Sequence, residues 1–169
     1  MSVISNTTVL SNFAAIDSLH RLHDLFEEVF LPTEVYQEIQ RGLEEGYAFY
    51  SGVDEVLHPK KEDGWLRLTS LNNEEEVLIF SGMPGQLHAG EASCLAIARQ
   101  RNWLFLTDDK AARRYAGNLK VAVSGTLGCL VLGIEGNLWS LEEANDWLKR
   151  IIASGFHSPV TDLAGLVKS

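Results

Sequence analysis

The stretch Trp103-Leu-Phe-Leu-Thr-Asp-Asp109 decides the fold class. Its four consecutive large apolar residues are typical of a strand buried on both faces, as in a parallel sheet. The two aspartates follow that strand directly, and a helix is expected to begin at about Lys110. In open parallel sheets, sites form outside the carboxyl ends of the strands. The stretch therefore predicts a parallel sheet with a polar site at its edge.

Strands and helices alternate throughout the rest of the sequence. Besides residues 103–106, strands are predicted at residues 3–4, 28–31, 65–69 and 121–123. Helices are predicted at residues 9–16, 18–26, 33–43, 74–80, 90–100, 110–115, 126–132, 141–152 and 162–167, and residues 42–59 are expected to form a helix and a loop. This alternation indicates βαβ units and a largely parallel α/β sheet.

The length and composition indicate one globular domain. The chain has 169 residues, 46% of them apolar, and no repeat or Pro/Ser-rich linker divides it, so residues 1–169 are predicted to form a single domain. Cys94 and Cys129 stand in apolar surroundings and are predicted to be buried free thiols, which fits a reducing cytoplasm. The start lacks the features of a signal peptide, and the apolar run at residues 122–134 is too short to span a membrane.

The charge balance constrains the function. The chain has 23 acidic and 14 basic residues, which gives a net charge of −9. Phosphate contacts come from Lys and Arg, so this balance alone disfavours binding to nucleic acid. An acidic protein can still act on a polyanion if a divalent cation lies between them. The positions of the acids therefore matter more than their number.

Polar and acidic residues are expected to meet at the site edge. Asn6 follows the first strand, Glu38 and Glu91 stand on helices, and Asp108 and Asp109 follow the apolar strand. Each has an ordinary explanation alone: a solvated helix residue, a charge at a helix start, or a helix N-cap. Clustered carboxylates about 4 Å apart would repel by ~4 kcal/mol at an effective dielectric of 20, a large share of a stability of ~5–15 kcal/mol. Such a cluster needs protons or a cation, and oxygen ligands suit Mg²⁺ or Mn²⁺.

Five segments, in order along the chain, resemble the PIN-domain family, and more narrowly its small prokaryotic toxin-like members. They are Val3-Ile-Ser-Asn-Thr-Thr-Val-Leu-Ser-Asn-Phe, Leu31-Pro-Thr-Glu-Val-Tyr-Gln-Glu-Ile, His88-Ala-Gly-Glu-Ala-Ser-Cys-Leu-Ala-Ile-Ala, Leu106-Thr-Asp-Asp-Lys-Ala-Ala-Arg-Arg-Tyr-Ala and Ser124-Gly-Thr-Leu-Gly-Cys-Leu. The resemblance implies a three-layer α/β/α sandwich with a mostly parallel sheet of about five strands.

The resemblance also implies a site and an activity. It makes Glu38, Glu91 and Asp108 catalytic, and it implies that Mg²⁺ or Mn²⁺ is held by Asn6, Glu38, Glu91, Asp108 and Asp109, with Thr7 and Thr126 as nearby polar groups. The implied activity is that of a metal-dependent endoribonuclease, the toxin of a toxin–antitoxin pair. The implied partners are RNA, a small antitoxin protein and a second copy in a homodimer. The densest basic group, Lys110, Arg113 and Arg114, follows the aspartates and is a candidate for holding RNA phosphates.

Asn6 departs from the family pattern, which has aspartate at this position. An amide offers only a neutral carbonyl oxygen, so affinity for a metal should fall. An alternative hypothesis follows: a catalytically degenerate PIN domain that binds RNA or a protein partner without cleavage. A P-loop nucleotide enzyme is disfavoured because no Gly-x₄-Gly-Lys-Ser/Thr segment is present.

Overall fold

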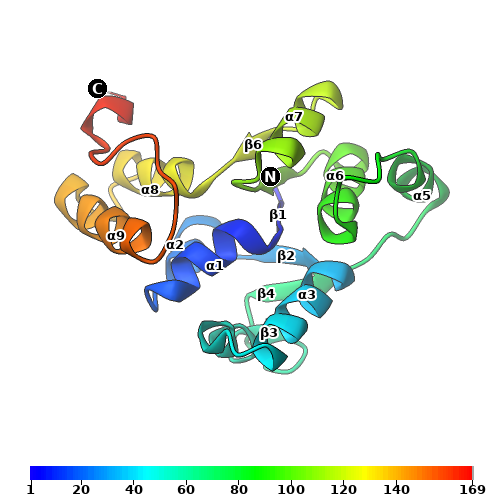
Figure 1. The fold of residues 1–169 in the computed structure, drawn as a ribbon, viewed down its shortest axis with the longest axis horizontal. Coiled ribbons are helices and arrows are strands. Elements are labelled where there is room, and N and C mark those ends of the chain that lie inside the picture. The colour runs from blue at the N-terminus through cyan, green and yellow to red at the C-terminus, as the bar shows by residue number, and fades with distance from the viewer. Residues whose placement is uncertain (169) are drawn as a thin grey trace.

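The computed structural model describes residues 1–168, in which six strands form one sheet with the order β3-β4-β2-β1-β5-β6 (Figure 1). Every neighbouring pair of strands is parallel. The strands are β1 (Val3–Ser5), β2 (Val29–Pro32), β3 (Leu57–His58), β4 (Leu66–Thr69), β5 (Leu104–Leu106) and β6 (Val123–Ser124). The α/β class with a parallel sheet is therefore confirmed, with one strand more than expected.

Helices connect the strands and cover the sheet. They are α1 (Thr7–Ala15), α2 (His20–Phe26), α3 (Thr33–Glu44), α4 (Ser51–Asp54), α5 (Glu74–Ser81), α6 (Ala89–Arg101), α7 (Lys110–Asn118), α8 (Thr126–Glu135) and α9 (Leu141–Ala153), with the 3₁₀ turns η1 (Ala48–Tyr50) and η2 (Ala164–Leu166). In Figure 1, α5 and α6 lie to the right of the sheet, and α8 and α9 lie to its left. Two helical layers thus enclose the sheet. Among residues 1–168 no helix is long and apolar enough to cross a bilayer.

The central helix α6 shows why the apolar pattern folds this way. Its residues from Gly90 to Ala98 are all buried, and it contacts β1, β2 and β5. A helix that is apolar nearly all round has to be enclosed by other elements. Its first turn, which carries Glu91, is consequently held at a fixed place against the sheet.

The expected boundaries were wrong in several places. β3 was not predicted, because a strand of two residues shows no period that a sequence pattern could reveal. Helix α1 begins at Thr7 rather than at residue 9, because Asn6 is its N-cap. Pro32 was expected to stop β2, yet it is the last strand residue and pairs with Thr69. A proline is tolerated there because the chain leaves the sheet at that residue.

The strand order places the site. β1 lies in the middle of the sheet, between β2 and β5. The chain reaches β2 on one side of β1 and returns to β5 on the other, which makes the β1–β5 boundary a topological switch point. Asn6 follows β1 and Thr107 follows β5 at this boundary. The backbone N–H of Asn6 donates to the Leu106 carbonyl there over 3.3 Å.

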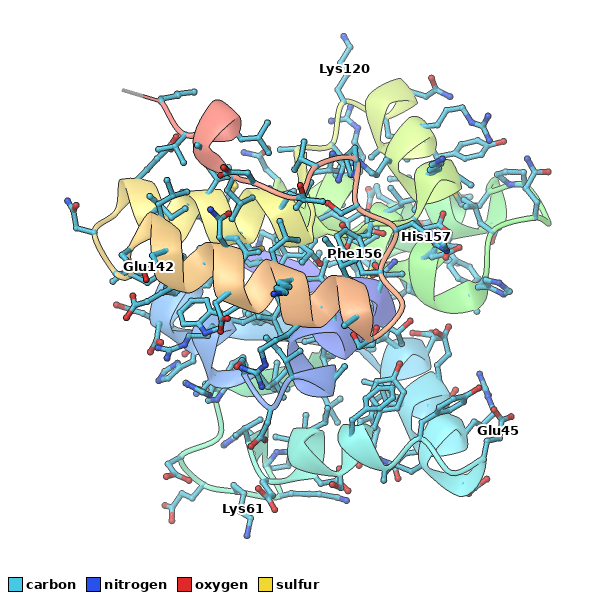
Figure 2. The ribbon with its side chains drawn as sticks, turned by 60° about the vertical axis from the view of Figure 1, so that its left-hand side comes forward. Glu45, Lys61, Lys120, Glu142, Phe156 and His157 are labelled. Atoms are coloured by element: carbon cyan, nitrogen blue, oxygen red, sulfur yellow. The ribbon has the colours of Figure 1, made fainter. Side chains whose placement is uncertain are left out.

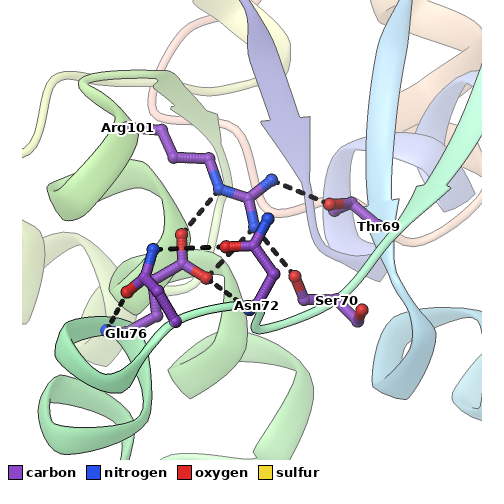
Figure 3. A network of polar contacts seen from close by, with 6 residues as sticks. Thr69, Ser70, Asn72, Glu76 and Arg101 are labelled. Carbon is purple, nitrogen blue, oxygen red and sulfur yellow. Dashed lines mark hydrogen bonds and ion pairs between the residues drawn. The ribbon is translucent and has the colours of Figure 1, made fainter.

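A buried ion pair fastens α5 to α6 and to the end of β4 (Figure 3). Arg101 Nε lies 2.6 Å from Glu76 Oε1, and the Glu76 side chain is fully buried. The guanidinium also donates to Thr69 Oγ1 and to the Ser70 carbonyl. Burial alone would raise the pKa of Glu76, but Arg101 and the Asn72 amide outweigh it and hold that pKa below its ordinary value. The pair therefore favours the ionised carboxylate.

The aromatic residues at the other end of the molecule belong to its core. Trp139 is buried and its indole Nε1 donates to the Leu130 carbonyl over 2.9 Å. Trp147 meets it edge-on with a centroid distance of 5.2 Å, and the Arg21 guanidinium lies over the Trp147 ring. Cys94 and Cys129 are buried free thiols, as predicted.

Candidate active site

Asn6 is a buried helix cap whose polar atoms are already engaged. Its Oδ1 accepts hydrogen bonds from the Thr8 amide over 3.1 Å and from Thr8 Oγ1 over 2.8 Å. Its Nδ2 donates to Thr107 Oγ1 over 2.7 Å. A carbonyl oxygen has two lone pairs, and both are used here. Asn6 thus joins the starts of two loops, after β1 and after β5, rather than presenting an open oxygen ligand.

The Asp108 carboxylate is held beside Asn6 by a set of donors. Oδ1 accepts from the Thr126 amide over 2.9 Å, and Oδ2 accepts from Thr126 Oγ1 over 2.5 Å and from Asn12 Nδ2 over 3.2 Å. The position of Thr126 next to Asp108 agrees with its expected place near the site. Asn12 was not predicted as a site residue. It lies within the first of the five segments, but its position in the sequence does not indicate a contact with Asp108. These bonds fix the carboxylate without an ion-pair partner of opposite charge.

Asp109 has a different role from its neighbour. Its Oδ1 accepts from the Ala112 amide over 2.8 Å and so caps helix α7, as one of the two aspartates was expected to do. Its charge also acts on Glu91, whose pKa it helps to raise. Asp109 therefore connects the β5 edge electrostatically to the first turn of α6.

Glu38 and Glu91 lie together where α3 meets the start of α6. A Cβ atom added to Gly90 would stand 2.5 Å from Glu38 Oε1, so the Glu38 carboxylate lies directly against the start of α6 and would have to move if residue 90 carried a side chain. Glu91 is 9% exposed, and its Oε2 accepts from the His88 amide over 3.0 Å. Burial raises the pKa of both carboxyl groups. For Glu91 the like charges of Asp109 and Glu38 add to that rise, while His88 opposes it for both residues.

We call these five residues, Asn6, Glu38, Glu91, Asp108 and Asp109, the acidic edge. They form two groups: Asn6 with Asp108 beside Thr126, and Glu38 with Glu91, which Asp109 approaches. Within residues 1–168, no three His, Cys, Asp or Glu side chains are close enough together to hold one metal ion. The predicted cluster is therefore only partly assembled.

The oxygen donors nevertheless suit a divalent cation. Mg²⁺ commonly takes one or two carboxylates and keeps several waters, so a set of three protein ligands is not required. A Cβ at Gly125 would stand 2.4 Å from Asp108 Oδ1, as one at Gly90 would meet Glu38 Oε1. Both carboxylates are thus seated directly against backbone that carries no side chain. Glu38 and Glu91 form a pair of carboxylates that could hold such a cation, and Asp108 offers a separate carboxylate beside Thr126.

Two depressions adjoin the acidic edge. The first is lined by Asn12, Phe49, Asp108, Asp109 and Lys110, and by Phe156 and His157 of the segment after α9 (Figure 2). The second is lined by Thr7, Ser11, Glu38, Arg41 and three aromatic residues. Thr7 therefore lines the same depression as Glu38.

The three basic residues of α7 differ in their surroundings. Lys110 is exposed and lines the depression that contains Asp108. Arg113 Nη1 donates to the Thr107 carbonyl over 3.0 Å, which ties this side chain to the end of β5. Arg114 is exposed. Lys110 is thus the best placed of the three to meet a phosphate beside the acids.

A parallel α/β sheet with carboxylates at its switch point defines the class of this domain, and sequence comparison gives the family. The model of the DUF3368 family, described as a PIN domain, matches residues 2–168. The chain therefore belongs to the PIN-domain family. PIN domains are in general nucleases that use divalent metal ions.

Comparison with solved structures gives a weaker likeness. The chain is similar to a PilT N-terminus domain protein, SSO1118, from the hyperthermophilic archaeon Sulfolobus solfataricus P2, with 13% identity and a TM-score of 0.43. The match covers 95% of this chain and 98% of that one. A likeness at this level supports no inference about function. No curated protein matches the sequence.

Proposed function

We propose that this PIN domain is a divalent-metal-dependent endoribonuclease, which hydrolyses phosphodiester bonds of RNA. The observation that carries the proposal is the seating of two carboxylates from distant segments against glycine backbone at one sheet edge, Glu38 at Gly90 and Asp108 at Gly125. Glu38 also lies close enough to Glu91 for its negative charge to raise the pKa of Glu91. Their repulsion is relieved when a cation binds.

The chain's own residues would divide the work in the following way. Thr126 and Asn12 hold the Asp108 carboxylate in place, and the His88 amide orients Glu91. Lys110 would position a phosphate of the substrate at the rim of the depression. When bound, Mg²⁺ or Mn²⁺ would lower the pKa of a water molecule and stabilise the charge that builds on the phosphate. Glu38 and Glu91, whose pKa values burial raises, would be suited to accept a proton from an attacking water molecule.

The proposed biological role is that of the toxin in a toxin–antitoxin pair, acting in the cytoplasm and neutralised by a small antitoxin protein, with homodimer formation as a further expectation. The resemblance of the five sequence segments to toxin-like PIN domains supports this role. It is tested separately from catalysis, by expressing the chain alone in a bacterial host and measuring growth.

One observation favours a second function, that of a PIN domain that binds RNA or a protein without cleaving. Asn6 uses both lone pairs of its oxygen within the protein and offers no charge to a cation. If this loss is decisive, the wild-type chain will not cleave RNA with either metal, whereas Asn6→Asp will restore cleavage.

Cleavage of a labelled single-stranded RNA in Mn²⁺, Mg²⁺ or EDTA tests the main proposal. The wild-type protein should cleave with metal and not with EDTA, and Asp108→Asn should lower the rate at least a hundredfold. Gly125→Ala changes no charge, but its Cβ would stand 2.4 Å from Asp108 Oδ1 and displace that carboxylate, so it should also lower the rate by more than tenfold. Gly117→Ala is the matched control, because a Cβ there meets no atom within 4 Å.

Two results would contradict the proposal. If Asp108→Asn cleaved RNA at the same rate as the wild type, the activity would lie elsewhere in the protein or come from a contaminant. Equal rates in Gly125→Ala and Gly117→Ala would show that the position of the Asp108 carboxylate does not matter. Circular dichroism of each variant checks that the fold is kept.

A further inference from the structure

Two aromatic side chains are exposed next to the acidic edge. Tyr47 is 52% exposed and Phe49 is 38% exposed, and they are the aromatic members of the exposed large hydrophobic residues of the described chain. Their ring centroids lie 6.0 Å apart, and Phe49 lies 4.6 Å from the ring of Tyr50. Exposed rings leave apolar surface in contact with water, and a flat ligand that stacks on them would bury that surface.

Phe49 stands between the two depressions of the acidic edge. It lines the depression with Asp108, Asp109 and Lys110, and it also lines the one with Glu38 and Arg41. A linear ligand that extends across the acids from one depression to the other can therefore contact this ring in both. Lys110 and Arg41 supply a positive charge at either end of that path.

The rings are held in place by the fold. A Cβ added to Gly42 of α3 would stand 2.8 Å from the ring of Tyr50, so α3 and the η1 turn are in close contact. The Tyr50 hydroxyl lies near Ser11 of α1 and near Glu38, both of which act on its pKa, although burial is the main cause of the rise. Tyr50 thus packs the η1 turn against α3, while Phe49 and Tyr47 remain exposed.

We propose that Tyr47 and Phe49 are a base-stacking platform for single-stranded nucleic acid beside the acidic edge. This inference rests on the proposed function, because it gives that site its substrate class. Aromatic rings next to a phosphate path bind unpaired bases of any sequence, since every base has a π-face. Bases inside a duplex are stacked on one another and cannot reach the rings. Arg41 lines one depression with both rings and Lys110 lines the other with Phe49, and these two cations suit a ligand that carries phosphates as well as bases.

The test measures binding and cleavage separately. Binding of a fluorescein-labelled 12-nucleotide RNA, as a single strand and as a duplex, is followed by anisotropy in Ca²⁺, with cleavage measured in Mn²⁺. The wild-type protein should prefer the single strand. Phe49→Leu keeps an apolar side chain but removes the ring, and it should weaken single-strand binding roughly tenfold through the loss of one stacked base. Phe49→Trp and Tyr47→Phe keep a ring and should bind as the wild type does.

A photochemical arm reports the contact itself. Irradiation of the complex with a 5-iodouridine oligonucleotide should cross-link the RNA to Tyr47 or Phe49, located by mass spectrometry of the digested protein. Leu78→Ala, which alters an exposed apolar residue of α5, should leave both binding and cross-linking unchanged.

The outcomes separate this inference from the proposed function. Cleavage that persists while Phe49→Leu binds like the wild type overturns the platform and leaves the nuclease intact. Single-strand binding that depends on the ring, without any cleavage, supports the platform and overturns the nuclease. Absence of binding to any oligonucleotide overturns the platform and leaves the exposed rings to a protein partner. Equal affinity for strand and duplex also overturns it.

Discussion

At position 6 an asparagine makes almost every contact that a capping aspartate would make. Its Oδ1 accepts from Thr8, and only the Nδ2 bond to the Thr107 hydroxyl needs an amide. Thr107 Oγ1 also accepts from the Asp109 amide over 3.1 Å. A hydroxyl has a proton of its own to donate, so it can turn that proton towards a carboxylate at position 6. The surrounding structure is therefore compatible with either residue.

Asn6→Asp should leave the fold intact and strengthen cation binding. The added charge lies at the same edge as Asp108, and a tenfold gain in affinity stabilises the protein by about 1.4 kcal/mol at saturating Mn²⁺. At this chain length, that gain raises Tm by roughly 3–6 °C. Differential scanning fluorimetry with Mn²⁺ and with EDTA measures the difference.

Asn137→Asp is the control for this change, because Asn137 is exposed in the turn after α8, and aspartate tolerates its φ of 59°. Its melting temperature should respond to Mn²⁺ as the wild type does. An identical metal-induced rise in Asn6→Asp and wild type would mean that position 6 does not contribute to any cation site.

The residues of the candidate site could be predicted only where they end a strand or begin a helix. Asn6, Asp108 and Asp109 are found from the apolar strands that precede them, and Glu91 from the start of a wholly apolar helix. Asn12 could not be found in this way, because its bond to Asp108 joins residues 96 positions apart and depends on the path of α1 over the sheet. Nor could the sequence show which aspartate caps α7.

At the scale of secondary-structure elements, the buried Glu76–Arg101 pair joins α5 to α6. Glu76 and Arg101 are 25 residues apart, so no local spacing predicts their pairing. Residues 42–59 were predicted as a helix and a loop, and the structure has a 3₁₀ turn, a helix of one turn and a strand of two residues there, elements too short for a sequence period to resolve. By contrast, α6 and β5 were predictable because long apolar runs must be enclosed.

Glu76→Gln should destabilise the protein by about 3 kcal/mol at pH 7, because it leaves Arg101 partly buried without its counter-charge. The folded-state pKa of Glu76 is lower than its unfolded value, so its contribution to stability is present above the unfolded pKa. It is lost as pH falls through the folded pKa. The free energies of unfolding of wild type and variant should therefore converge below about pH 4. Urea unfolding at pH 7 and pH 3.5 measures both gaps.

Asp24→Asn removes the exposed partner of Arg21 and provides the comparison for Glu76→Gln. A surface pair contributes ~0–1 kcal/mol, so this variant should unfold nearly as the wild type does. If both variants lost the same free energy of unfolding, the buried Glu76–Arg101 pair would contribute no more to stability than an exposed pair.

At the scale of the whole molecule, acidic groups act on stability with opposite signs. Glu76 stabilises the fold when it is ionised, whereas burial makes ionisation of Glu38 and Glu91 unfavourable. The chain already has a net charge of −9, which adds self-repulsion to these local costs. A protein that keeps buried acids at one sheet edge under these conditions gives up stability there, which is expected of a binding or catalytic site.

Glu38→Gln should therefore make the protein more stable while abolishing metal-dependent cleavage. The folded-state pKa of Glu38 is raised, so the carboxyl ionises in the unfolded chain before it ionises in the folded one. Its ionisation reduces stability as pH rises through the unfolded and then the folded pKa, and glutamine avoids this loss. The gain should be below about 1 kcal/mol at pH 7.5, because the group is only half-buried, and it should vanish near pH 4.

Saturating Mn²⁺ should remove or reverse this gain, because a bound cation stabilises the wild-type carboxylate and not the amide. Thermal unfolding of Glu38→Gln and wild type at pH 4 and pH 7.5, with Mn²⁺ and with EDTA, measures all four differences. Glu44→Gln, at an exposed position of the same helix, should show none of them. A Glu38→Gln variant that is less stable than the wild type at pH 7.5 in EDTA would show that Glu38 is a structural residue, and the acidic edge would then lose its main sign of functional strain.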